Sequence, residues 1–250
     1  MTLSLLVCVG LLAAPFVLAP FLVRATHKAA ARPTFEPVDP ETGRIPEEPW
    51  LFFMRTLNAL SGAGFTEAGY LHQSGYTPNV ESWLLLLENR PRQEAAIAAA
   101  IDATTGGIKS RYVEFSANFQ DGVSVSANNS DVIPAFAPVA GKHTLQFPDV
   151  ADPLRLHRIH LALVARLGSR SRRRYPAEGQ FVEFLIESMT REMERQVGTG
   201  YLVLDGQGVF YRATWKGAFL MTWKLLWPVS TILKARRCRR NARLLADLGL

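Results

Sequence analysis

The sequence predicts an α+β fold behind an N-terminal transmembrane helix, and three observations carry this prediction. Residues 3 to 23 contain no charged side chain. Between about residues 65 and 147, apolar and polar residues alternate, which is the period of strands with one buried face. From residue 152 onward, apolar residues recur every three or four positions, as they do on one face of a helix. We therefore expect an antiparallel β-meander packed with helices, followed by a largely helical C-terminal part.

The uncharged N-terminal run matches a membrane span in length. A helix of 21 residues, at about 1.5 Å per residue, spans the ~30 Å hydrocarbon core of a bilayer. Arg24, Lys28 and Arg32 follow it, and no basic residue precedes it, so the positive-inside rule places the rest of the chain in the cytoplasm. A cleaved signal peptide would need a basic start and a shorter apolar core. The sequence predicts a single-pass cell-membrane protein anchored by residues 1–23.

A proline-rich segment follows the predicted anchor. Five prolines lie between residues 33 and 49, and this composition predicts an extended spacer over residues 24–49. A helix is expected after it, near residues 50–61, with Glu47 and Glu48 favouring its N-terminal end.

The central part of the chain is predicted to form five or six strands. Residues 65–72 and 80–88 are strand candidates, residues 111–125 have the pattern of a hairpin, and residues 142–147 supply a further short strand. The alanine-rich segment 94–103 has the composition of a helix but lies between short turns, and we prefer a strand. The links are too short for crossover helices, so the sheet should be antiparallel.

The C-terminal half is predicted to alternate helices with a small hairpin. Asp152 and Pro153 are typical of a helix start, and a longer helix is expected at residues 178–197. A hairpin at 201–212 and an apolar segment at 217–233 follow. The predicted organisation is an anchor (1–23), a spacer (24–49), an α+β domain (50–175), a helix-hairpin-helix segment (176–233) and a basic tail (234–250).

The step from this hairpin into the next helix resembles a known structural family. Tyr211 to Ala218 read Tyr-Arg-Ala-Thr-Trp-Lys-Gly-Ala after a helix and a hairpin, which resembles the wing of winged-helix proteins. The resemblance covers only residues 178–222 and implies a nucleic-acid binder. The long helix before the hairpin carries acidic as well as basic residues, which disfavours nucleic acid as the partner.

The aromatic segment and the basic tail predict a membrane-surface site. The apolar segment is marginal as a span because Lys224 and Pro228 interrupt it. Lying in the interface instead would place its tryptophans at the lipid headgroups and its tail near anionic lipid. The predicted membrane-surface residues are Trp215, Trp223, Lys224, Trp227, Lys234, Arg236, Arg237, Arg239, Arg240 and Arg243.

The sequence shows no motif for a cofactor or a metal ion. Residues 104–110 lack the glycine that a phosphate-binding loop places before its lysine. His157 and His160 are three apart on a predicted helix, but no third ligand follows a known spacing, so His160 is expected to be a hydrogen-bonded core histidine. No catalytic residue is identified, and no nucleophile or dinucleotide motif occurs.

These observations favour a binding or scaffold module over an enzyme. Its expected partners are anionic membrane lipids and a further protein. An enzyme that acts on a lipid or a small molecule is the alternative, because active sites are often assembled from residues scattered in sequence.

Overall fold

The computed structural model describes residues 2–74, 79–103 and 109–250. Within them the chain forms six α-helices and two β-sheets. It divides into two compact units. Unit 1 contains residues up to 33, residues 132–139 and residues 188–239, and unit 2 contains residues 34–131, 140–187 and 240–250. The predicted α+β class is confirmed.

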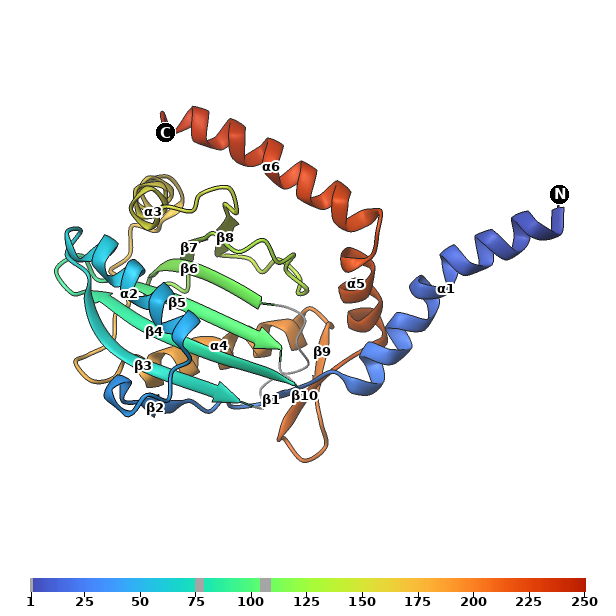
Figure 1. Ribbon diagram of the computed structural model, residues 1–250, viewed down its shortest axis with the longest axis horizontal. Helices are drawn as coiled ribbons and strands as arrows, with labels where there is room; N and C mark the ends of the chain where they lie inside the picture. The colour runs from blue at the N-terminus through green and yellow to red at the C-terminus, as the bar shows by residue number, and fades with distance from the viewer. Residues whose placement is uncertain (1, 75–78, 104–108) are drawn as a thin grey trace. The chain divides into compact units, whose positions relative to one another are not determined.

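Unit 2 is built around a seven-stranded sheet in the order β2-β3-β4-β5-β6-β7-β8 (Figure 1). Neighbouring strands are antiparallel except for β7 and β8, which are parallel because the chain between them is long enough to return to the same end of the sheet. The predicted antiparallel sheet is therefore wrong for this last pair. The strands are β2 (Glu36–Val38), β3 (Thr66–Ser74), β4 (Val80–Asn89), β5 (Glu94–Ala103), β6 (Lys109–Asn118), β7 (Ser124–Asn128) and β8 (Lys142–Gln146).

The alanine-rich segment forms the central strand β5, which confirms the preferred prediction. It pairs along its whole length with β4, from Val80 opposite Ala103 to Asn89 opposite Glu94, and also pairs with β6. Continuous pairing on both sides outweighs the helix propensity of alanine, which is a weak preference by comparison. Glu94 lies at the start of this strand.

Helices cover both faces of this sheet within unit 2. On one face, α2 (Glu47–Ser61) and α3 (Pro153–Leu167) contribute Phe53, Ile159 and other apolar side chains to a core that includes Phe115 of β6. On the other face, Phe181 at the start of α4 (Phe181–Gly198) packs with Leu86. The side chain of Asp152 accepts hydrogen bonds from the first turn of α3, so the predicted helix start is confirmed.

Unit 1 contains a second, smaller sheet. Its strands are β1 (Lys28–Ala30), β9 (Leu202–Leu204) and β10 (Phe210–Ala213), in the antiparallel order β1-β10-β9. Its helices are α1 (Thr2–Thr26), α5 (Trp215–Leu225), the later turns of α4 and the first turns of α6 (Val229–Asp247). The predicted hairpin is present, with β1 as a third strand.

The predicted spacer contains regular structure. Strands β1 and β2 and a short 3₁₀ helix, η1 (Pro40–Thr42), all lie within residues 24–49. Pro37 is tolerated in β2 because this strand is at the edge of the sheet, where one side needs no backbone donor. The proline content predicted only an extended spacer and did not indicate these short elements.

The predicted transmembrane anchor is wrong. Among the helices in the described ranges, none is long and apolar enough to cross a membrane. The predictions of a single-pass topology and of a cell-membrane location rested on the anchor and are wrong with it. The uncharged run is part of a helix that continues through Arg24 to Thr26 and packs beside α5, with the ring centroids of Phe21 and Trp215 5.0 Å apart. Apolar residues in a helix also serve packing against another helix.

Candidate functional site

Helix α5 carries the centre of the predicted surface site, and its start is defined by one threonine. The hydroxyl of Thr214 accepts a hydrogen bond from the backbone N–H of Gly217 at 2.9 Å and donates one to the carbonyl of Gly200 at 2.7 Å. A Cβ atom at Gly217 would lie 2.0 Å from the carbonyl oxygen of Tyr201, so only glycine allows this approach. The cap and the glycine together set which face of α5 is buried.

The opposite face of α5 exposes large aromatic side chains. Trp215, Phe219 and Trp223 are four residues apart and are 56%, 52% and 45% exposed. Side chains at this spacing lie along one face of a helix. Phe21 of α1, 57% exposed, contacts Trp215 edge to face. We call these four side chains the aromatic face of unit 1.

Exposed apolar residues are concentrated in unit 1. Among the residues whose side chains the structure describes, 18 large hydrophobic side chains are exposed, and only Leu51, Leu154 and Leu250 belong to unit 2. Single exposed apolar residues are ordinary, but a contiguous group of them indicates an interaction surface. Phe219 and Phe21 were not among the predicted surface residues, although Phe219 lies midway between Trp215 and Trp223 in the sequence.

Helix α6 carries the predicted basic residues, and four of them share a face. Arg236, Arg239, Arg240 and Arg243 are all exposed and follow the i, i+3, i+4, i+7 pattern. In the later turns of the helix, Asn241 is buried and its side-chain amide donates to the carbonyl of Gln146. We call the four arginines the basic face of α6. Lys234 is also exposed, and Arg237 is half-buried.

The other two predicted residues of this region differ in their surroundings. Trp227, between α5 and α6, is 70% exposed. Lys224 instead reaches into unit 1, where its ammonium group donates to the carbonyls of Ala135 and Phe136 at 3.3 and 3.0 Å. Burial lowers the pKa of Lys224. Trp227 is therefore exposed like the side chains of the aromatic face, whereas the ammonium group of Lys224 is hydrogen-bonded within the protein.

Unit 2 contains a buried polar cluster that the sequence did not reveal. Nε2 of His157 lies 2.9 Å from a carboxylate oxygen of Glu94, and both side chains are almost fully buried. Burial by itself would raise the pKa of Glu94, but the hydrogen bond from His157 and nearby positive charge outweigh it and hold that pKa below its usual value. Glu94 is therefore ionised at neutral pH. The two residues are far apart in sequence, and no motif links them.

His160 lies beside this pair and is buried without a hydrogen bond. Its ring stacks near Phe115, with centroids 5.9 Å apart, and neither ring nitrogen has a partner among the described residues. Burial lowers the pKa of His160 to about 4, so the imidazole is neutral at pH 7. The predicted core position is confirmed, and the predicted hydrogen bond is wrong. No group of metal-ligating side chains occurs in the parts of the chain that the structure describes.

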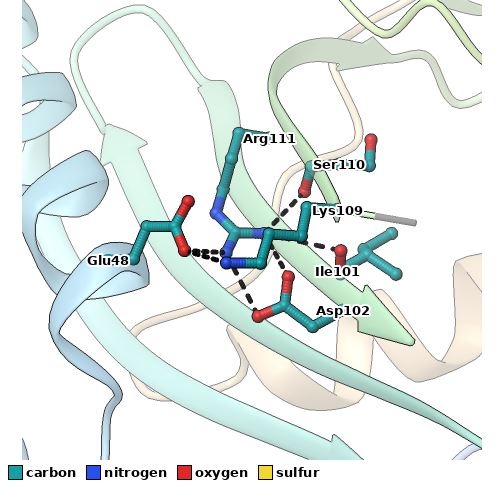
Figure 2. A network of polar contacts seen from close by, with 6 residues as sticks. All are labelled: Glu48, Ile101, Asp102, Lys109, Ser110 and Arg111. Atoms are coloured by element: carbon teal, nitrogen blue, oxygen red, sulfur yellow. Dashed lines mark hydrogen bonds and ion pairs between the residues drawn. The ribbon is translucent and has the colours of Figure 1, made fainter. Parts of the chain in front are cut away.

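A second polar cluster joins α2 to the end of β5 and the start of β6. Figure 2 shows Arg111 facing Asp102 with two parallel hydrogen bonds of 2.7 and 3.1 Å, and Lys109 donating to Glu48 at 2.5 Å. The guanidinium of Arg111 also donates to the carbonyls of Ile101 and Ser110. The charges in this cluster neutralise one another, so we interpret it as a structural contact. Most of the segment compared with a phosphate-binding loop, residues 104–108, lies outside the described residues.

Comparisons with known proteins give no relative. The chain matches no protein-family model, and no curated protein and no solved structure is significantly similar to it.

Proposed function

We propose that this protein binds the surface of an anionic membrane as a peripheral binding module, through the aromatic face of unit 1 and the basic face of α6. The observation that carries the proposal is the exposure of Trp215, Phe219 and Trp223 along one side of α5. Tryptophan and phenylalanine suit the boundary between headgroups and acyl chains, since their rings are apolar and the indole N–H reaches polar groups.

The charge of the chain supports lipid as the occupant of this surface. The net charge is +6, and six basic residues lie between positions 234 and 243. A Lys or Arg near an anionic membrane surface contributes about 1 kcal/mol of binding free energy at low ionic strength. The four arginines of the basic face are spaced so that one helix side presents them together. Apolar side chains and cations on two consecutive helices complement anionic lipid better than they complement a neutral surface.

Vesicle co-sedimentation of the full chain tests the proposal. We expect the chain to bind vesicles that contain phosphatidylserine, and to bind phosphatidylcholine vesicles much more weakly. Binding should weaken as salt is raised, because salt screens exposed charges.

Two variants separate the apolar from the electrostatic contribution. Changing Phe219 and Trp223 to Ser should reduce binding at every salt concentration. Changing Arg236, Arg239, Arg240 and Arg243 to Gln should weaken binding to anionic vesicles on the order of a thousandfold, since about 1 kcal/mol is lost per charge. The matched control makes the same charge change at four exposed arginines elsewhere, Arg44, Arg55, Arg155 and Arg170. Equal loss in both arginine sets, or no preference for anionic lipid, would contradict the proposal.

The same samples distinguish lipid from a second copy of the chain. If the aromatic face mediated self-association, the chain would sediment as a dimer without vesicles, and the Phe219 and Trp223 variant would be monomeric. That outcome would assign the surface to a protein interface.

A further inference from the structure

A pocket with a volume of about 300 Å³ lies in unit 2, on the side of the sheet covered by α2 and α3. Its walls come from the end of α2, the turn between β4 and β5, and the first half of α3. The side chains and backbone that line it include those of Gly62, Arg92, Leu154, His157, Arg158 and Leu161. The volume falls at the lower end of the range for small-molecule sites, roughly 300 to 1,000 Å³.

Two arginines give this pocket its charge. Arg92 and Arg158 are exposed, and neither guanidinium forms an ion pair with a residue that the structure describes. By contrast, the neighbouring Arg90 pairs with Glu88 at 3.0 Å. No carboxylate is among the residues that line the pocket. The site therefore presents two cations that the described part of the protein leaves without a counter-charge.

His157 forms the inner wall of the pocket and is held in one orientation. Its ring packs against Phe65 and Phe115, with centroids 5.0 and 5.1 Å away, and only 4% of the residue is exposed. Because the ionised carboxylate of Glu94 only accepts hydrogen bonds, Nε2 of His157 carries the proton of their contact.

We propose that this pocket binds the phosphate group of a small molecule. Arg92 and Arg158 donate N–H groups to the phosphate oxygens, and the ring of His157 lines the wall of the same pocket. Guanidinium groups suit this ligand because their planar donors match the geometry of phosphate oxygens. Two cations in a pocket whose lining residues include no carboxylate favour a dianionic group over a carboxylate with a single charge, and the nearby carboxylate of Glu94 is occupied by its hydrogen bond with His157. This site is independent of the membrane surface proposed for unit 1.

A titration of the full chain with inorganic phosphate, and separately with acetate, tests the proposal. Binding is followed through the imidazole ¹⁵N signals of His157 and through the melting temperature. We expect a saturable response to phosphate and a much weaker one to acetate. Arg158→Ala should weaken phosphate binding about tenfold or more, as expected for the loss of hydrogen bonds to a charged group. Arg155→Ala is the matched control, because Arg155 is exposed on the same helix and does not line the pocket.

A second variant fills the pocket without touching its charges. Gly62 has helical backbone angles, φ −67° and ψ −17°, and a Cβ atom there would have no other atom within 4 Å. Gly62→Leu should therefore keep the melting temperature and remove phosphate binding, whereas Gly198→Leu, at an equally open position outside the pocket, should keep both. No saturable phosphate response, or equal effects of Arg158→Ala and Arg155→Ala, would overturn the site. Equal binding of acetate and phosphate would overturn the phosphate assignment.

Discussion

The imidazole of His157 and the carboxylate of Glu94 meet 2.9 Å apart inside unit 2, although they are 63 residues apart in the chain. Glu94 begins the central strand β5, and His157 lies on α3, which packs against that side of the sheet. Each of the two buried side chains gives the other a hydrogen-bond partner that it would otherwise lack. This contact links the sheet to the helix that forms the inner wall of the pocket.

Removing the carboxylate should destabilise unit 2. Glu94→Ala leaves the buried His157 without its partner, and we expect a loss of about 2 kcal/mol in the free energy of unfolding. Glu94→Gln should lose less, because the amide oxygen still accepts from Nε2. Urea denaturation at pH 7 measures both values. If the two variants unfolded like the unaltered chain, the pair would have no role in stability.

His160 should make the protein sensitive to acid. Its pKa in the folded chain, about 4, lies below its ordinary value of 6.5. Between these values the unfolded chain binds more protons, so the free energy of unfolding falls as pH drops from 6.5 to 4, by on the order of 3 kcal/mol.

A methionine at this position tests the cause. His160→Met removes the titrating group and the two buried nitrogens that lack partners, and methionine adapts to irregular packing. We expect the variant to be at least as stable as the unaltered chain at pH 7 and to lose less stability between pH 7 and pH 4.5 in urea titrations. The same loss of stability in both proteins would show that another group causes the acid sensitivity.

In the cluster of Figure 2, the pair of Arg111 and Asp102 should contribute more to stability than the pair of Lys109 and Glu48. Asp102→Asn removes the negative charge and one of the two parallel bonds to Arg111, whose side chain is only 17% exposed, and should cost about 1 kcal/mol in thermal unfolding. Glu48→Ala removes the exposed partner of Lys109, and exposed ion pairs contribute little. We therefore expect no measurable change for Glu48→Ala, and a larger effect there than at Asp102 would contradict this assignment.

The sequence predicted the elements whose patterns are local. Strands β3 to β8 lie where alternation and turn residues placed them, and the start of α3 lies at the predicted Asp152. The sequence did not predict β1 and β2, because three-residue edge strands are too short to show a period and the proline content of the region favours a loop. The parallel pairing of β8 with β7 also depends on the chain between them returning to the same end of the sheet. The alternation of apolar and polar residues does not predict that return.

How far each candidate site could be predicted depends on how close its residues are in the sequence. The aromatic and basic residues of α5 and α6 are near one another in sequence, so composition was enough to single them out. Lys224 could not be separated from them, since its bonds to the carbonyls of Ala135 and Phe136 come from a distant segment. The pocket around His157, Arg92 and Arg158 is assembled from three segments far apart in the chain and leaves no pattern in any one of them.

We propose that the exposed tryptophans of unit 1, Trp215, Trp223 and Trp227, enter a lipid surface. The chain has five tryptophans, and Trp50 and Trp83 belong to unit 2. Changing these two to Phe leaves Trp215, Trp223 and Trp227 as the source of tryptophan fluorescence. The converse variant, with those three changed to Phe, is the matched control.

The most direct measurement is quenching of this fluorescence by vesicles whose phospholipid acyl chains carry bromine. Bromine quenches only at short range, so it reports insertion of the rings rather than attraction to the surface. We predict strong quenching with anionic brominated vesicles in the first variant, no quenching in the converse variant, and release of the quenching at high salt. Unchanged tryptophan fluorescence in the first variant, in the presence of saturating anionic vesicles, would contradict membrane binding through the aromatic face.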